Sequence, residues 1–140
     1  MVLIISDYHK REDKVLSLIE KYHPDRIFNL GDSESDDYFL MRNNILSVKG
    51  NCDYINLPTL LTVDFNGIKI LLTHGHLYQV KFGLLRLKLL AKEQHCQYCF
   101  FGHTHSQFME VVDGILFLNP GSLINGHYAL MDDDGLITLY

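Results

Sequence analysis

The sequence predicts an α/β protein in which two β-sheets pack face to face and helices cover them. Over residues 1–48, short apolar segments alternate with amphipathic helical segments. In the rest of the chain, Asn-Gly and Asp-Gly pairs separate apolar runs, a pattern typical of β-hairpins. One further helix is expected at residues 79–94, within this second half.

The first half is predicted to form a βαβαβ unit. Apolar runs indicate its strands, at residues 2–6, 26–30 and 45–48. Two helical segments separate these strands, at residues 11–22 and 35–42. The first helix carries apolar side chains at helical spacing: Val15, Leu16, Leu18 and Ile19.

The second half is predicted to be largely a meander of hairpins. Leu60–Phe65 and Ile68–Thr73 flank Asn66-Gly67, which is a strong signal for a two-residue turn. Asp113-Gly114 and Asp134-Gly135 occupy the same position between later apolar runs. The 140 residues contain no repeat, linker or low-complexity segment, so a single domain over residues 1–140 is expected.

Composition and charge argue against several classes of protein. No apolar run approaches the roughly 18 residues of a membrane span. The N-terminal Met-Val-Leu-Ile-Ile lacks the basic start of a signal peptide, so a cytoplasmic protein is expected. The net charge of −5 argues against a general nucleic-acid surface, and a basic aromatic face for single-strand binding is missing.

The three cysteines fit a reducing compartment, because their number is odd and their density is low. Cys96 and Cys99 form a solitary Cys-x-x-Cys, which raises the alternative of a second metal or redox site. A structural role is favoured, since Cys99 falls in an apolar strand run and no second Cys pair exists.

Seven side chains that bind metals follow apolar runs in this chain: Asp7, His9, Asp32, Asn51, His74, His103 and His105. Successive side chains of a strand alternate between its faces, so two residues of the same parity are expected to point toward one ion. The two imidazoles of Gly-His-Thr-His can also be divided between neighbouring ions. Neighbouring glycines allow the backbone to turn sharply and to approach the ions closely. The pattern predicts a two-metal centre at one edge of the sheets.

The order of these motifs is specific. Asp-x-His, Gly-Asp, Gly-Asn-Cys-Asp, His-Gly-His and Gly-His-Thr-His, over residues 2 to 122, resemble the calcineurin-like metallophosphoesterase superfamily. The short length, the Asn-Cys-Asp variant and the Asn-Pro-Gly-Ser segment at residues 119–122 resemble its YfcE-type phosphodiesterases. The resemblance implies a four-layer α/β/β/α sandwich of two mixed sheets, the metallo-dependent phosphatase-like fold.

The resemblance also implies a ligand set and a reaction. One ion would be held by Asp7, His9 and His105, the other by Asn51, His74 and His103, and Asp32 would bridge them. Mixed carboxylate, amide and imidazole ligands favour two first-row divalent ions, with Mn²⁺ expected first and Ni²⁺, Fe or Zn²⁺ as alternatives. The expected reaction is hydrolysis of a small-molecule phosphodiester by a bridging water.

Three residues near these motifs have open roles in proton transfer. Cys52 stands where larger phosphatases of the family have a histidine close to the leaving group, so unactivated monoesters are expected to be poor substrates. His76 is the candidate proton donor, and with Asp32 and Asn51 it completes the expected catalytic set. Asp53 is expected to support the ligands or the turn, with proton transfer as the alternative.

Some alternatives to this interpretation stay open. Lys81, Lys88 and Lys92 recur at helical spacing, which favours a solvated helix face over a phosphate-binding patch. The retromer scaffold subunit has the same fold and binds protein partners, so a non-catalytic scaffold is the alternative function. The complete ligand set favours the enzyme. A homodimer through an exposed strand or helix is a further alternative.

Overall fold

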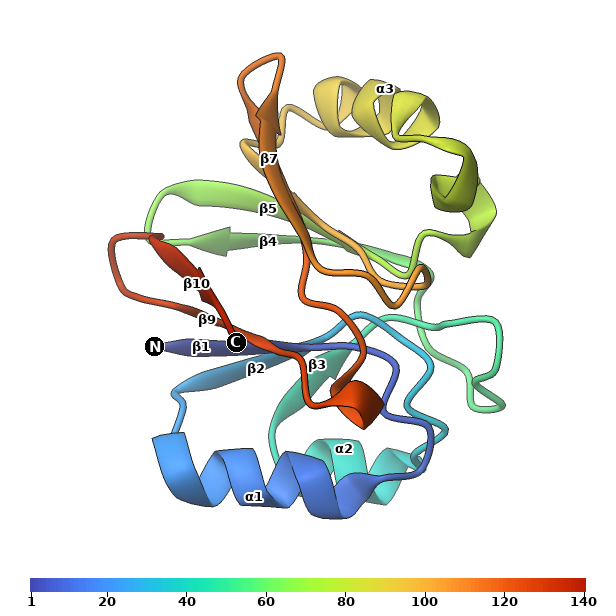
Figure 1. Ribbon diagram of the computed structural model, residues 1–140, viewed down its shortest axis with the longest axis vertical. Helices are drawn as coiled ribbons and strands as arrows, with labels where there is room; N and C mark the ends of the chain where they lie inside the picture. The colour runs from blue at the N-terminus through green and yellow to red at the C-terminus, as the bar shows by residue number, and fades with distance from the viewer.

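The computed structural model describes all 140 residues, and its strands form two five-stranded sheets that lie face to face (Figure 1). The first sheet has the order β10-β9-β1-β2-β3. Its strands are β1 (Val2–Ile5), β2 (Arg26–Asn29), β3 (Ile45–Ser47), β9 (Ala129–Met131) and β10 (Ile137–Leu139). The second sheet has the order β4-β5-β6-β8-β7. Its strands are β4 (Leu60–Phe65), β5 (Ile68–Thr73), β6 (Tyr98–Phe100), β7 (Phe108–Val112) and β8 (Ile115–Asn119).

Both sheets are mixed. In the first, β1, β2 and β3 run parallel. On the other side of β1, β9 pairs antiparallel with β1, and β10 pairs antiparallel with β9. In the second, β5, β6 and β8 run parallel, and β4 and β7 are joined to them as antiparallel hairpins. Parallel strands end at the same edge of a sheet, so the loops that follow them are brought together there.

Helices cover the outer faces of the two sheets (Figure 1). The first sheet is covered by α1 (Glu12–Tyr22) and α2 (Asp37–Arg42), and the second by α3 (Leu85–Glu93). Short 3-10 turns are η1 (His76–Tyr78), η2 (Val80–Phe82) and η3 (Leu123–Asn125). The expected four-layer α/β/β/α sandwich of two mixed sheets is confirmed.

Three apolar clusters fill the spaces between the layers. The central one joins the inner faces of the sheets and includes Ile4, Phe28, Ile70 and Phe100. The second lies under α1 and α2, and the third packs Leu87 and Ala91 of α3 on the second sheet. None of the helices is long and apolar enough to span a membrane.

Most expected elements agree with the structure to within two residues, but the helix expected at residues 79–94 is wrong in its first part. Gln79 and Gly83 have φ of 53° and 121°, and these conformations interrupt the helix. The segment therefore forms η1 and η2 before α3 begins at Leu85. Lys81 consequently lies in η2 and does not share a helix face with Lys88 and Lys92.

Candidate metal centre

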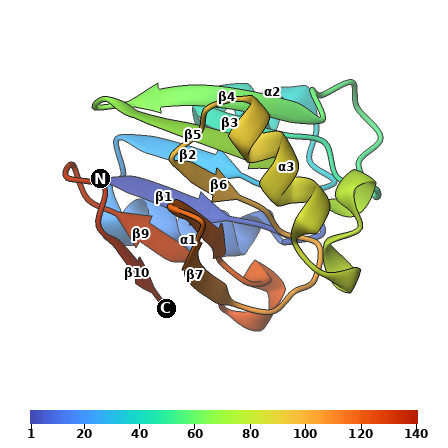
Figure 2. The ribbon, with the colours of Figure 1, turned by 90° about the horizontal axis from the view of Figure 1, so that it is seen from above.

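The seven predicted ligands follow the ends of five strands: β1, β2, β3, β5 and β6. The loops that follow β1 and β6, one from each sheet, lie at the same end of the molecule (Figure 2). These loops leave the extended conformation at once, with φ of 55° at Asp7, 39° at His9, 68° at His103 and 63° at His105. The expected alternation along a continuing strand is therefore wrong, although the side chains do converge. Left-handed conformations cost non-glycine residues about 1–2 kcal/mol each, and such strain gathers at functional sites.

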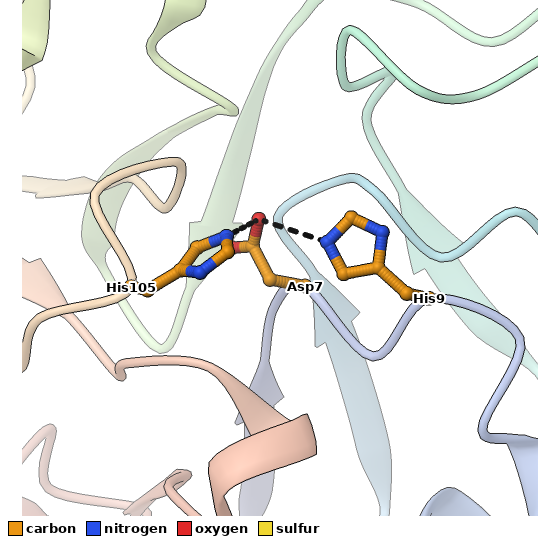
Figure 3. Close-up of side chains that lie close together, drawn as sticks. All are labelled: Asp7, His9 and His105. Carbon is orange, nitrogen blue, oxygen red and sulfur yellow. Dashed lines mark hydrogen bonds and ion pairs between the residues drawn. The ribbon is translucent and has the colours of Figure 1, made fainter.

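One group of ligands centres on Asp7 (Figure 3). Its Oδ1 lies 3.1 Å from Nε2 of His105 and 4.0 Å from Nε2 of His9. The two imidazoles approach this carboxylate from loops 96 residues apart in the sequence, and their ring centroids are 5.8 Å apart. One nitrogen or oxygen of each of the three residues lies within 4.8 Å of the others, a spacing that suits a single ion.

A second group centres on His74. Its Nε2 lies 3.2 Å from Oδ2 of Asp32 and 3.1 Å from Oδ1 of Asn51. His103 completes this group, with a ring centroid 5.1 Å from that of His74. The two groups adjoin, because Nε2 of His74 is also 3.9 Å from Oδ1 of Asp7.

Close backbone approach explains the glycine before Asn51. A Cβ atom at Gly50 would lie 2.1 Å from Oδ1 and 2.4 Å from the backbone nitrogen of Asp32. A Cβ at Gly31, where φ is +101°, would lie 2.7 Å from Nδ1 of His74. Both glycines are therefore required by the packing of the ligand loops against one another.

The charges of the cluster fit a cation. Asp7 and Asp32 are fully or almost fully buried, and their only ion-pair partners are histidines. Burial opposes ionisation of Asp32, but the hydrogen bond and charge of His74 outweigh it and lower the pKa of Asp32 to about 2. Burial likewise opposes protonation of His74, but Asp32 and Asp7 raise its pKa. Buried carboxylates that are paired only with imidazoles suit divalent metal ions.

Five of the seven predicted ligands, all except Asp7 and His74, line a cavity of about 250 Å³. Its surface is formed by His9, Asp32, Asn51, Cys52, Lys81, His103, Thr104 and His105. Lys81 is an exposed residue of η2. Burial, then the charge of His74, and then the charge of Lys81 lower the pKa of His103. The interpretation of Lys81 as part of a solvated helix face is therefore wrong. Gly83 is the one residue of the segment around Lys81 whose type indicates an interrupted helix, because glycine disfavours a helix interior.

Asp53 organises the loops beneath this cavity. Its carboxylate accepts hydrogen bonds from the backbone nitrogens of Asp32, Glu34 and Gly50, at 2.9, 2.8 and 2.7 Å. The residue is buried and does not line the cavity. This geometry agrees with the expected supporting role and gives Asp53 no access to a bound molecule.

Cys52 and His76 differ in their access to the cavity. Cys52 lies on its surface, and burial together with the charge of Asp32 raises the pKa of its thiol. Its sulfur also lies within 4.8 Å of ligand atoms of His9 and Asp32. His76 does not line the cavity, and its ring centroid lies 5.4 Å from that of His74. Its buried Nδ1 has no hydrogen-bond partner, and burial and then the charge of His74 lower its pKa.

The remaining candidates lie away from this cluster. Cys96 and Cys99 are free, buried thiols in the apolar cluster under α3, and burial raises the pKa of each. Neither belongs to a group of three metal-binding side chains. Lys88 and Lys92 both form ion pairs with Asp113, each at 3.2 Å. These ion pairs join α3 to the turn between β7 and β8.

Comparison with known proteins agrees with this geometry. The model of the calcineurin-like phosphoesterase superfamily domain matches residues 1–132. The chain belongs to this superfamily. A Bacillus subtilis protein named "Probable metallophosphoesterase YsnB" is 36% identical over 125 residues, covering 87% of this chain and 74% of that protein. A crystal structure of a predicted phosphoesterase from Streptococcus pneumoniae is 29% identical with a TM-score of 0.83, covering 99% of this chain and 95% of that one.

Two further relatives represent different functions on this fold. A phosphodiesterase of Methanocaldococcus jannaschii is 26% identical over 140 residues, covering 84% of this chain and 81% of that protein. The vacuolar protein sorting-associated protein 29 of Schizosaccharomyces pombe is 29% identical over 147 residues, covering 96% of this chain and 78% of that protein. The superfamily is therefore shown, whereas the choice between these two functions depends on the site.

Proposed function

We propose that this protein is a phosphodiesterase that uses two divalent metal ions. The observation that carries the proposal is the convergence of Asp7, His9 and His105 in one group and Asp32, His74 and His103 in an adjoining one. Asn51 belongs to the second group through its contact with His74. Two adjacent groups of mixed carboxylate and imidazole ligands suit first-row metals, and Mn²⁺ is the metal proposed first.

The chain's own residues position the ligands and the substrate. Asp32 lies between the two groups, since its carboxylate contacts His74 and also shares a ligand group with His9. When bound, two metal ions lower the pKa of water and neutralise the charge of a phosphate, which is the chemistry of this superfamily's reaction. Lys81 lines the same cavity and adds a positive charge for the phosphate.

The proposed preference for acidic leaving groups rests on Cys52. This thiol lies on the cavity surface, and it occupies the sequence position at which larger phosphatases of the family have a histidine close to the leaving group. Its raised pKa keeps it protonated at neutral pH and makes it a poor acid. Ester groups that leave without a proton are therefore favoured, and diesters with acidic leaving groups fulfil this condition. A small-molecule phosphodiester is the proposed substrate class.

The decisive experiment measures metal content and hydrolysis together. Protein purified without chelator should contain two metal ions per chain and should hydrolyse bis(p-nitrophenyl) phosphate. Chelation should abolish turnover, and Mn²⁺ or Ni²⁺ should restore it. Asp32→Asn should lose metal and turnover while its circular dichroism spectrum stays unchanged, because its side chain lies at a strand end outside the apolar clusters. Wild-type turnover in a metal-replete Asp32→Asn protein would contradict the role given to Asp32.

The same measurement separates the enzyme from a scaffold. The relative from Schizosaccharomyces pombe makes a scaffold role the second candidate. A scaffold would need neither bound metal nor turnover, and its partner surface would have to bind protein instead. A metal-loaded protein that hydrolyses no phosphodiester would favour the scaffold.

A further inference from the structure

Two cavities lie between the same pair of segments, the short turn η2 and the loop that joins β6 to β7. The metal cavity is lined by Lys81 of the turn and by residues 103–105 of the loop. A second cavity, of about 310 Å³, is lined by Val80 of the turn and by residues 104, 106 and 107 of the loop. Because Thr104 lines both cavities, the second one continues from the metal centre.

We propose that the second cavity binds the ester group that stays on the phosphate during hydrolysis, and that this group is short and apolar. The preferred substrate is then a phosphodiester with one acidic leaving group and one apolar ester group. The leaving-group argument from Cys52 still holds, because the retained ester keeps its bond to phosphorus and needs no proton. The inference rests on the proposed function, since it names the substrate class of the same site.

The wall of the second cavity is mainly apolar. Its apolar members are Val80, Leu84, Phe101 and Phe108. All four belong to the apolar cluster under α3 or pack against it, so the packing of that helix holds the wall in place. Removal of apolar surface from water is favourable in proportion to the area buried and has no preferred direction. The wall therefore selects a ligand group by its apolarity and size.

The polar residues of the wall offer few hydrogen bonds to a ligand. Oγ1 of Thr104 already accepts a hydrogen bond from Nδ2 of Asn119, at 2.9 Å. Nε2 of Gln107 donates to two backbone carbonyl oxygens, at 3.2 and 2.7 Å. Ser106 adds a hydroxyl, but this residue is exposed to water. A hydroxylated or charged ester group would lose hydrogen bonds to water on entering the cavity, which is unfavourable.

The turn η2 serves both parts of such a ligand. Lys81 lines the metal cavity, whereas its neighbour Val80 lines the apolar one. The turn therefore provides a cation for the phosphate and an apolar side chain for the ester group attached to it. A volume of about 310 Å³ lies at the lower end of the range for small-molecule sites, which suits a short alkyl chain or a single ring.

The test compares p-nitrophenyl diesters that differ only in the retained ester group. Methyl, butyl and 2,3-dihydroxypropyl p-nitrophenyl phosphate share one leaving group, so differences in kcat/KM report binding of the retained group. A fully buried methylene contributes about fourfold, so partial burial of the longer chain should give the butyl ester a roughly tenfold higher kcat/KM than the methyl ester. The dihydroxypropyl ester is close to the butyl ester in size and should behave like the methyl ester. Equal values for the methyl and butyl esters, or a preference for the dihydroxypropyl ester, would overturn the inference.

A pair of variants assigns the preference to this cavity. Leu84→Gln places an amide in the wall and should reduce the butyl-to-methyl ratio to about twofold or less. Leu85→Gln is the matched control, since Leu85 is the next residue, is 65% exposed and is not part of the cavity, so the ratio should stay at the wild-type value. The same ratio in both variants would place the preference elsewhere and overturn the inference. The comparison of the three esters in the wild type decides the matter if Leu84→Gln does not fold.

Calorimetry separates this inference from the proposed function. Butyl phosphate and methyl phosphate are titrated into the manganese-loaded wild type, and butyl phosphate should bind about tenfold more tightly. Tighter binding of butyl phosphate without any diester hydrolysis would support the apolar site and contradict the proposed enzyme. Hydrolysis of bis(p-nitrophenyl) phosphate combined with equal binding of the two monoesters would overturn the apolar site alone.

Discussion

Nδ1 of His74 lies 2.7 Å from the carbonyl oxygen of Leu30, which follows β2 in the other sheet. This contact fixes Nδ1 as the donor, because a carbonyl oxygen only accepts. Nε2 therefore faces the carboxylate of Asp32, 3.2 Å away, as a metal-ligating nitrogen must. The two sheets are thus linked at the centre of the candidate site by one imidazole.

The pair of His74 and Asp32 should make the stability of the metal-free protein depend on pH. The pKa of His74 is raised above 6.5, so its contribution is fully present below pH 6.5 and is lost as the pH rises through the raised value. The pKa of Asp32 is lowered from 3.8 to about 2, so its contribution is present above pH 3.8 and is lost as the pH falls toward 2.

We therefore expect His74→Asn to destabilise the metal-free protein more at pH 6 than at pH 9, as measured by thermal unfolding in a chelating buffer. Burial and then the charge of His74 lower the pKa values of His76 and His103, so the difference from the wild type includes the loss of this repulsion. His95→Asn is the control, because His95 is exposed at the end of α3 and should show no such trend. A constant difference between pH 6 and pH 9 would mean that His74 carries no proton in the pair.

Asp53→Asn should weaken metal binding without removing a ligand. The carboxylate accepts three backbone hydrogen bonds from the loops that hold Asp32 and Asn51, and an amide replaces one accepting oxygen with a donor. Loss of such a supporting group costs about 10–100-fold in metal affinity. Competition with a chromogenic chelator measures this change. Asp64→Asn is the control, because Asp64 lies near the end of β4 and accepts a hydrogen bond from Gly67 of the β4–β5 turn; equal affinities for the two variants would refute the supporting role.

Lys81→Gln should weaken binding of the anionic substrate. A hydrogen bond to a charged group contributes about 1.5–3 kcal/mol, which corresponds to an increase of about 10–100-fold in the KM for bis(p-nitrophenyl) phosphate or in the inhibition constant of inorganic phosphate. Lys88→Gln removes the same charge from α3, where Lys88 pairs with Asp113, and it should change neither value. Similar effects of both substitutions would show that only the overall charge of the protein matters.

The sequence predicts the layers of this fold better than it predicts the backbone of the site. Apolar periodicity and the Asn66-Gly67 turn are local signals, and the strands beside them form as expected. Asp7 and His103 adopt left-handed conformations in loops of different sheets, and the backbone nitrogen of His103 donates to Oδ2 of Asp7 at 3.2 Å, a contact between distant residues that no local pattern encodes. The same reason explains Lys81, since its position depends on where Gln79 and Gly83 interrupt the helix.

The final prediction concerns the acid that the leaving group needs. An aryl oxygen leaves without a proton, whereas an alkyl oxygen requires one, and general acid catalysis contributes about 10²–10⁴-fold. The wild type should therefore hydrolyse bis(p-nitrophenyl) phosphate much faster than an alkyl monoester such as glycerol phosphate. Cys52→His places an imidazole on the cavity surface and should raise alkyl monoester hydrolysis relative to the aryl diester. Cys52→Ser removes the thiol without adding an acid, so it should leave this ratio unchanged.

If the wild type already favours the alkyl monoester, another group donates the proton, and His76→Asn should then abolish that preference. His76 is the first residue to test, because its imidazole is not one of the predicted ligands and its ring centroid lies 5.4 Å from that of the ligand His74.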